Sequence, residues 1–321
     1  KDAEERHQSM KELRSDLSRL KEEFTPPTPM VRAERRIKSM LLGFAGATVA
    51  IAILASLWLY FLAPTDLVPS EPPVVVPLTS MQGTEYHPSL SPDGKHVAFV
   101  GGHFTGGNIM VSQVGVPEGV PLPVTNSARD TGPVWSADGG SIFFLRVVQA
   151  PWLDEDPGDR AAWLQVCSVP ALGGPEREWA KIRMMILEMT GTPYLAVTRD
   201  GRSLVVAGHP ESEEGSGLYV LSLETREMRR LTEPPGLESL DYSPCLSPDG
   251  RTLAFMRASG EGGGDIYTLS LDERMQPTRE PEHLFSIPAM FRGFAWDQRG
   301  KGLIYSAGLV NDMQLWSCLL Y

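Results

Sequence analysis

The chain has 321 residues, of which 42% are hydrophobic and 21% charged, and its formal net charge is −11. This composition supports a folded core and excludes a wholly disordered chain, while the acidic balance argues against a nucleic-acid-binding protein, which needs a basic face. The three cysteines have no CxxC spacing, which excludes a zinc ribbon and a disulfide framework.

The net charge is divided unevenly along the chain. Residues 1–39 carry ten Lys and Arg against eight Asp and Glu, whereas residues 64–321 carry a net charge of −13. Between them, residues 40–63 contain no charged side chain. This asymmetry predicts two differently charged parts joined by an apolar segment.

Residues 1–24 are predicted to form an amphipathic helix. Apolar side chains recur at i, i+3, i+7, i+10 and i+14, namely Met10, Leu13, Leu17, Leu20 and Phe24. A short juxtamembrane coiled coil is the alternative, but about two heptads fall below the three or four that such a prediction needs.

The same segment resembles the end of a bacterial Ser/Thr protein kinase domain, which closes with a K-D-P-x-x-R element and a helix of the type S-x-x-E-L-x-x-D-L. The matching residues are Lys1, Asp2, Arg6, Ser9, Glu12, Leu13, Asp16 and Leu17, with Ala3 in place of the usual proline. The resemblance implies a structural role for Arg6, whose counterpart pairs with the glutamate of the A-P-E motif. The chain has no phosphate loop after a strand and no V-A-I-K, H-R-D or D-F-G motif, so it is not a kinase by itself.

Residues 25–39 form a basic juxtamembrane linker, and residues 40–63 are a predicted transmembrane helix. The uncharged stretch exceeds the ~20 residues that a helix needs to cross the ~30 Å hydrocarbon layer. A buried core helix or a cleaved signal peptide fits this length and position less well. Basic residues precede the stretch and acidic residues follow it. The positive-inside rule therefore predicts a single-pass protein of a bacterial inner membrane, with a cytoplasmic N-terminus and residues 64–321 outside.

Residues 64–77 are rich in proline and are predicted to form an extended spacer. Residues 78–321 then contain five similar segments: YHPSLSPDGKHVAFV, TGPVWSADGGSIFFL, GTPYLAVTRDGRSLVVA, YSPCLSPDGRTLAFM and FRGFAWDQRGKGLIYS. Their turn glycines are 45, 62, 49 and 50 residues apart. Each segment joins two strand patterns through a turn, and a further strand pattern usually follows. Four strands in such a period are typical of a β-propeller blade, so the predicted fold class is all-β.

Turn chemistry accounts for most carboxylates in these repeats. The aspartate can bond nearby backbone amides, and the glycine supplies the positive φ that closes the hairpin. The structural turn residues are Asp93, Gly94, Asp138, Gly139, Asp200, Gly201, Asp249, Gly250 and Gly300. The third turn lacks a proline and the fifth has Arg299 where Asp is expected, so looser turns are predicted there.

The repeats resemble the TolB-type propeller repeat, a relative of the WD repeat that many bacterial envelope proteins carry. The resemblance implies a TolB-like β-propeller over residues 78–321, with five blades visible in the sequence. Residues 74–80 resemble an outer strand that would pair with the last blade and close a five-bladed ring. The favoured alternative is a six-bladed ring cut short, because the related propellers usually have six or more blades.

No catalytic residue, cofactor site or metal site is predicted. The six histidines form no HxH or HxxxH pair, and there is no G-x-S-x-G elbow. The sequence GEGGGD at residues 260–265 lies between two predicted strands, which favours a hairpin loop over a phosphate loop. Cys167, Cys245 and Cys318 are predicted to be buried apolar filler, with a disulfide as the alternative.

Binding is the remaining role for the repeats. Loops between the second and third strands of each blade, and loops between blades, gather on one face of a propeller. The residues predicted for a partner-binding face are His103, Phe104, Trp152, Asp154, Glu155, Asp156, Glu213 and Glu214. Such an acidic face favours a cationic peptide, a basic protein or a divalent ion. The alternative is a solvated acidic rim with Trp152 packed locally.

Together these features predict the extracytoplasmic sensor or interaction propeller, with its membrane anchor, of a bacterial receptor-type Ser/Thr kinase. Its predicted partners are the membrane and an extracytoplasmic peptide, protein or small ligand; no nucleic acid is expected at the propeller, and a homodimer is left open. Two alternatives remain: the sensor part of a membrane-anchored winged-helix transcriptional regulator, and a TolB-like envelope scaffold.

Overall fold

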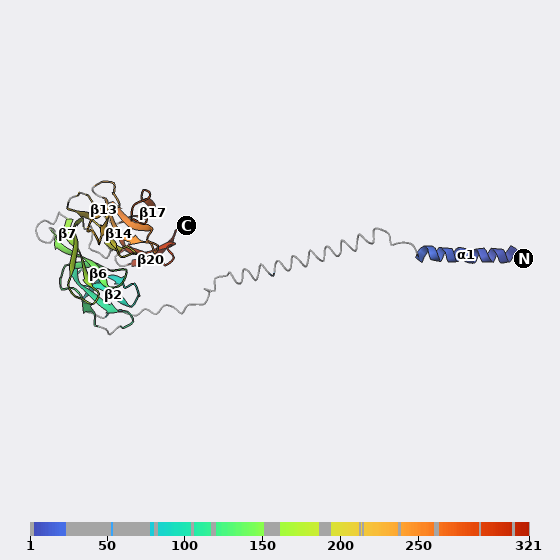
Figure 1. The fold of residues 1–321 in the computed structure, drawn as a ribbon, viewed down its shortest axis with the longest axis horizontal. Helices are drawn as coiled ribbons and strands as arrows, with labels where there is room; N and C mark the ends of the chain where they lie inside the picture. The colour runs from blue at the N-terminus through green and yellow to red at the C-terminus, as the bar shows by residue number, and fades with distance from the viewer. Residues whose placement is uncertain are drawn as a thin grey trace. The chain divides into compact units, whose positions relative to one another are not determined.

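The computed structural model describes residues 3–23, 53, 78–79, 83–103, 106–116, 120–150, 161–185, 194–211, 213, 215–236, 239–259, 263–288, 290–309 and 312–320 (Figure 1). The chain divides into two compact units, Lys1–Val74 and Val75–Tyr321. The division falls close to the end of the predicted proline-rich spacer.

The described part of the first unit is essentially one helix. Helix α1 spans Ala3–Glu23, where the sequence predicts an amphipathic helix. Its apolar stripe is exposed, and the stripe consists of Met10, Leu13, Leu17 and Leu20. No helix within the described residues is both long and apolar enough to cross a membrane. The predicted linker, transmembrane segment and spacer at residues 25–77 lie outside the described residues, apart from Ile53.

The second unit consists of strands arranged in five consecutive meanders, numbered here 1 to 5 along the chain. Meander 1 comprises β1 (Thr84–Leu90), β2 (His96–His103), β3 (Gly106–Gln113) and β4 (Leu122–Pro123). Meander 2 comprises β5 (Asp130–Trp135), β6 (Ser141–Gln149), β7 (Ala161–Pro170) and β8 (Arg177–Met185). Meander 3 comprises β9 (Leu195–Val197), β10 (Ser203–Ala207), β12 (Leu218–Ser222) and β13 (Met228–Arg230).

The last two meanders follow the same pattern. Meander 4 comprises β14 (Ser239–Leu246), β15 (Thr252–Ser259), β16 (Gly264–Ser270) and β17 (Glu282–Ile287). Meander 5 comprises β18 (Met290–Trp296), β19 (Gly302–Leu309) and β20 (Asp312–Leu319). The short strand β11 (His209–Pro210) pairs with β8, outside the meander pattern. Pairing within each meander is antiparallel between neighbours, as short hairpin connections require.

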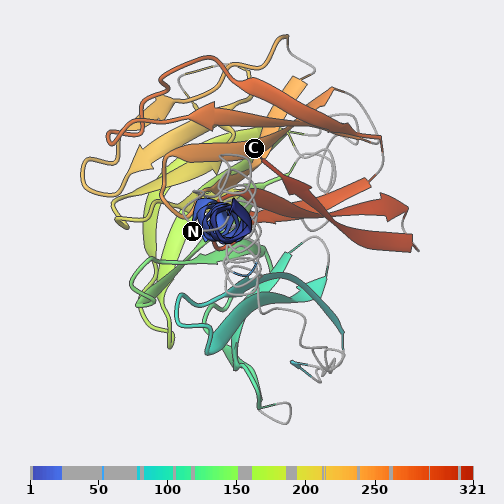
Figure 2. The ribbon, with the colours of Figure 1, turned by 90° about the vertical axis from the view of Figure 1, so that its right-hand side faces the viewer.

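The meanders follow one another around a common centre in chain order (Figure 2). Their first strands, β1, β5, β9, β14 and β18, contact one another in that order, so we call them the inner strands. In the predicted closing strand at residues 74–80, the described Leu78 and Thr79 belong to no strand, and the other residues lie outside the described part. The number of blades in the ring therefore stays a prediction.

The core lies between successive meanders. Neighbouring residues of a strand point to opposite faces, so Phe144 packs toward meander 1 while Phe143 and Leu145 pack toward meander 3. Fully burying one such side chain contributes ~1.5–3 kcal/mol. A further cluster joins meanders 4 and 5 around Phe294 and Leu303. Both faces of meanders 2 to 4 are thus apolar, which explains the nearly continuous apolar runs in their sequences.

Two buried ion pairs occupy equivalent places in meanders 2 and 4. Asp130 of β5 lies opposite Arg146 of β6, and Asp241 of β14 lies opposite Arg257 of β15. Both contacts are bidentate, with nitrogen–oxygen distances of 2.6 and 2.9 Å in the first pair and 2.6 and 2.8 Å in the second. Both aspartate side chains are fully buried. Burial raises the pKa of Asp130, and the bond to Arg146 opposes that rise.

We expect Asp241→Asn to lower the free energy of unfolding by ~3–5 kcal/mol, because removing one partner leaves a buried charge without compensation. Asp130→Asn should cost less, since Arg146 keeps its second partner, Glu176. Urea unfolding of both variants measures the difference, with the exposed Glu211→Gln as control. Equal, small losses in all three variants would show that the pairs do not stabilise the fold.

Candidate binding site at the turn ends of the inner strands

The turn after each inner strand is closed by a repeated set of hydrogen bonds. In meander 1 the Ser91 hydroxyl donates to Asp93 Oδ1 at 2.7 Å, and Asp93 Oδ1 accepts from the Lys95 backbone N–H at 3.1 Å. The Gly94 N–H donates to the Ser91 carbonyl at 2.8 Å, and Gly94 has a φ of 70°. Equivalent bonds close the turns around Asp138 and Asp249.

The looser turns predicted for meanders 3 and 5 are not observed. Thr198 takes the place of the serine, and its hydroxyl donates to Asp200 Oδ1 at 2.6 Å, while Gly201 N–H bonds to the Thr198 carbonyl at 2.8 Å. In meander 5, Asp297 occupies the serine position, and its own carboxylate accepts from the Lys301 N–H at 2.7 Å. The Asp297 side chain thus replaces both the hydroxyl and the aspartate of the other turns, because its carboxylate accepts directly from the Lys301 N–H.

Successive turns pack against one another. A Cβ atom added to Gly139, Gly201, Gly250 or Gly300 would meet the second turn residue of the preceding meander at 3.4–3.8 Å. Those residues are Pro92, Ala137, Arg199 and Pro248, respectively. The turn glycines therefore serve two purposes, a positive φ and close contact with the preceding turn. As a result, the turns form a continuous row at one end of the inner strands.

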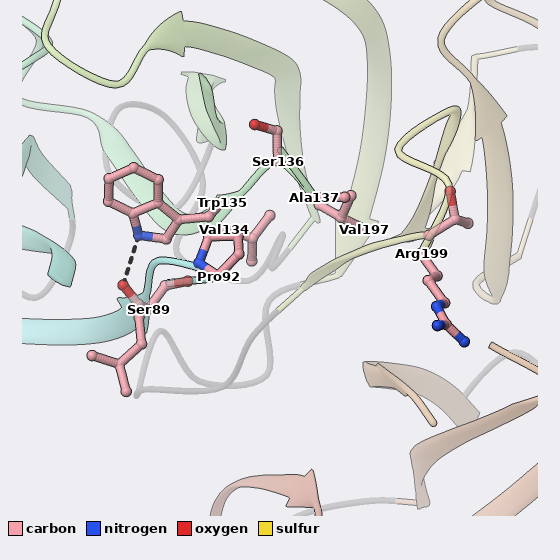
Figure 3. Close-up of a pocket in the computed structure, with 10 residues that line it drawn as sticks. Ser89, Pro92, Val134, Trp135, Ser136, Ala137, Val197 and Arg199 are labelled. Carbon is pink, nitrogen blue, oxygen red and sulfur yellow. Dashed lines mark hydrogen bonds between the residues drawn. The ribbon is translucent and has the colours of Figure 1, made fainter. Parts of the chain in front are cut away.

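A pocket of about 280 Å³ lies in this row, across meanders 1, 2 and 3 (Figure 3). It is lined by Ser89, Leu90, Pro92, Val134, Trp135, Ser136, Ala137, Val197, Thr198 and Arg199. The Trp135 indole donates to the Ser89 carbonyl at 2.9 Å and so ties two inner strands together. Trp296 makes the equivalent bond to the Cys245 carbonyl at 3.0 Å between meanders 4 and 5.

The lining of the pocket is mixed: apolar side chains alternate with the hydroxyl-bearing residues Ser89, Ser136 and Thr198, and one cation lies at the rim. Leu90 is 61% exposed although it is a large aliphatic side chain. In Figure 3 the Arg199 side chain extends from the side of the pocket opposite Trp135. A concave surface that combines apolar contact area with a few polar groups is a usual form of a binding site. The sequence did not predict this pocket, because it arises where three turns far apart in the chain come together.

The predicted partner-binding face is described at few positions. Phe104, Trp152, Asp154, Glu155, Asp156 and Glu214 lie outside the described residues, and so does the side chain of His103 at the end of β2. The predicted kinase-tail residue Arg6 lies in α1, and its side chain is also outside the described part. Glu213 is described: it accepts from the Tyr219 hydroxyl at 2.7 Å and from Arg230 at 2.9 Å. Glu213 is therefore already engaged within meander 3.

One Ser–His–Asp group lies on β16 and β17. Ser286 Oγ donates to Asp265 Oδ1 at 2.5 Å, and both atoms lie 3.4 Å from His283 Nε2. In a nucleophilic triad the acid orients the histidine through the ring nitrogen that does not face the serine. Here the serine and the aspartate share one nitrogen, so the geometry is that of a surface polar cluster. Among the described residues no group of three or more His, Cys, Asp and Glu could hold a metal ion.

Burial shifts the pKa values of three further side chains in the described part of the second unit toward their neutral forms. Burial lowers the pKa of His87 to about 4, and it raises the pKa of Cys167 to about 12 and that of Cys245 to about 11. All three cysteines of the chain are described, and all are free. Cys167 is buried as predicted, whereas Cys245 and Cys318 are only partly buried, so the prediction of buried filler is wrong for these two. A raised pKa suppresses the reactive thiolate, so Cys167 and Cys245 are inert packing groups.

Comparisons with solved structures identify the fold. TolB from Acinetobacter baumannii matches with a TM-score of 0.57 and 16% identity, covering 75% of this chain and 53% of that protein. A protein assigned as TolB from Agrobacterium tumefaciens gives 0.53 and 18%, covering 74% and 78%. An oligogalacturonate lyase in complex with manganese gives 0.50 and 16%, covering 75% and 63%.

These matches confirm the predicted all-β, TolB-like propeller fold. Because the sequence identities are only 16–18%, the matches show a shared fold and do not show a shared function. The chain spans about half the length of the Acinetobacter protein. No protein-family model matches the sequence, and no curated protein matches it. Because the neighbours include both TolB proteins and a lyase, the fold by itself assigns no activity.

The turn carboxylates should make stability fall in acid. Hydroxyl and amide donors hold the pKa values of Asp138 and Asp249 below the ordinary 3.8. Each carboxylate therefore stabilises the fold above that value and loses its contribution as pH falls through the folded pKa. We expect Asp138→Asn/Asp249→Asn to flatten the decline in unfolding free energy between about pH 5 and pH 2. Urea titrations across this range measure it, and a slope equal to that of the parent protein would contradict the assignment.

Proposed function

We propose that the second unit is a protein-binding propeller that holds its partner at the turn-end pocket. The main evidence for this proposal is the pocket formed by the turns of meanders 1, 2 and 3. Its 280 Å³ is slightly smaller than the ~300–1,000 Å³ typical of small-molecule sites. A cavity of that size suits one anchoring side chain of a partner protein, and such buried anchors supply most of the affinity of many interfaces.

The composition of the rim supports the same function. Leu90 and Pro92 provide apolar contact area, and Arg199 provides a guanidinium that can pair with an acidic group of the partner. The Trp135–Ser89 hydrogen bond fixes the pocket wall before a partner arrives. Such preorganisation reduces the entropy lost on binding.

Site-specific photocrosslinking in the source cell tests the proposal. A photoreactive residue at position 90 should give a discrete adduct, and Arg199→Glu should reduce it about tenfold or more because the rim charge is reversed. Leu172, which is 77% exposed on the β7–β8 turn, is the matched control position. The same adducts at both positions, or adducts insensitive to Arg199→Glu, would refute binding at the pocket.

We further propose that this propeller is the extracytoplasmic part of a membrane-anchored receptor of the Ser/Thr kinase type. Three features support this context: the kinase-like residues at positions 1–17, the uncharged stretch at residues 40–63, and the basic residues before that stretch. Partner binding outside would then alter the geometry or pairing of the receptor, and the kinase would report it inside the cell.

Topology and upstream sequence test this context separately. A reporter enzyme that is active only outside the cytoplasm should be active when fused after Pro77 and inactive when fused after Ser39. The coding sequence before Lys1 should contain the V-A-I-K lysine and the H-R-D and D-F-G motifs. A winged-helix domain in that position would favour the transcriptional regulator, and an active fusion after Ser39 would exclude the predicted orientation.

A further inference from the structure

Two arginines from different meanders lie over one tryptophan. Arg177 Cζ is 3.9 Å from the centroid of the Trp179 ring, and Arg226 Cζ is 5.9 Å from it. Arg177 and Trp179 belong to β8 of meander 2, whereas Arg226 lies in the turn between β12 and β13 of meander 3. Both distances fall within the ~6 Å over which a cation is attracted to an aromatic face. We call these three residues the arginine–tryptophan cluster.

The tryptophan of this cluster is fixed by the fold. Its Nε1 donates to Ser168 Oγ at 2.9 Å, and its ring packs against the core, with its centroid 6.1 Å from that of Phe143. The ring is therefore held in place before a ligand arrives, which reduces the entropy lost on binding. Tryptophan and arginine are also, with tyrosine, the residue types that most often dominate the binding energy of protein interfaces.

The two guanidinium groups are exposed and have no acidic partner. Within the described residues, neither Arg177 nor Arg226 donates a side-chain hydrogen bond or forms an ion pair. The arginines of the two buried ion pairs, by contrast, each bind an aspartate through two nitrogens. The acid next to Arg177 on β8, Glu178, accepts instead from Gln165 at 2.8 Å. The donor groups of both cluster arginines are therefore available to an anionic ligand.

The backbone at position 226 gives no reason for an arginine. In meanders 1 to 4 the turn between the third and fourth strands contains a residue with positive φ, namely Gly115, Gly173, Arg226 and Met275, at 82°, 82°, 63° and 58°. Glycine adopts this conformation freely, whereas a side chain there is disfavoured. The arginine is thus kept at some cost to folding, which indicates that its side chain has a role.

The cluster lies at the same end of the meanders as the turn-end pocket. The Leu223 N–H donates to the Arg202 carbonyl at 2.9 Å, so the turn that contains Arg226 lies beside the turn between β9 and β10. The latter turn contains Arg199, at the rim of the pocket. A partner anchored in the pocket can therefore extend along meander 3 to the cluster.

We propose that the arginine–tryptophan cluster binds carboxylate side chains of an acidic segment of the partner protein. A guanidinium binds a carboxylate with its edge, through two parallel hydrogen bonds, and stacks on an aromatic ring with its face. Arg177 and Arg226 can therefore bind carboxylates while Trp179 keeps both of them oriented. This inference rests on the proposed function for the nature of the ligand, a protein held at the turn-end pocket.

Calorimetric titration of the purified full chain with a defined peptide, acetyl-tetraglutamate amide, tests the site. Acetyl-tetraglutamine amide is the matched control, since it has the same length without the charge. At low ionic strength we expect saturable binding of the glutamate peptide and binding of the glutamine peptide that is weaker by about tenfold or more. Arg177→Gln/Arg226→Gln should weaken glutamate-peptide binding about tenfold. Arg129→Gln/Arg279→Gln, which removes the same charge from two exposed arginines elsewhere in the second unit, should bind like the parent protein.

A further variant separates binding from folding. We expect Arg226→Gly to have a urea unfolding midpoint at least equal to that of the parent protein, because glycine is unstrained at a φ of 63°. The same variant should bind the glutamate peptide several-fold more weakly. A clearly lower midpoint would assign Arg226 to folding and overturn the proposal. Equal affinities for the two peptides, or equal losses of affinity in the two double variants, would also overturn it.

The cluster and the turn-end pocket are tested by separate results. A photoadduct at Leu90 in a chain that does not bind the glutamate peptide would overturn the cluster site alone. Binding of the glutamate peptide that depends on Arg177 and Arg226, without an adduct at Leu90, would support the cluster and refute binding at the pocket.

Discussion

Each of meanders 2 to 4 of the second unit has two apolar faces, and each face is covered by the neighbouring meander on that side. Phe143 and Phe144 show the constraint in two adjacent residues, since one packs toward meander 3 and the other toward meander 1. A sheet of this kind cannot exist alone in water, because either face would expose a large apolar area. The arrangement around a centre follows from this requirement, and the row of turns follows from the arrangement.

The row of turns explains why side chains from separate repeats lie close together at one end of the inner strands, where the pocket lies. Each turn is closed by side-chain hydrogen bonds, such as those of Ser136 and Asp138 in meander 2. Each turn also contacts the preceding one through its glycine. Side chains at the second turn position are therefore held close together without belonging to any core. Pro92, Ala137 and Arg199 can vary in chemistry while the backbone beneath them stays the same.

The regular parts of the structure could be predicted from the sequence because their causes are local. The turn at Asp249–Gly250 and the apolar alternation around Phe255 depend on residues within one hairpin, so the repeats revealed both the strands and the propeller class. The tight turn at Asp297 was missed because a carboxylate at the serine position can do the work of two side chains. The sixteen-residue spacing of Asp130–Arg146 and Asp241–Arg257 was a visible signal of the buried pairs. The pocket had no such signal, since its walls come from three separate repeats.

The hydrogen bonds and ion pairs show which acids contribute to the net charge of −13 that residues 64–321 carry. Asp130 and Asp241 are buried and paired with arginines, so they offer no charge to a partner. The turn aspartates are bonded to amides and hydroxyls but are exposed and stay ionised, so they contribute to the negative surface. Glu85 differs from Asp130 and Asp241 in one respect, because Gly101 lies opposite it where meanders 2 and 4 have an arginine, and its Oε1 is buried without a hydrogen-bond partner. An oxygen that has lost its hydration without gaining a donor is costly for stability. Meander 1 therefore lacks the stabilising ion pair that meanders 2 and 4 have at the same place.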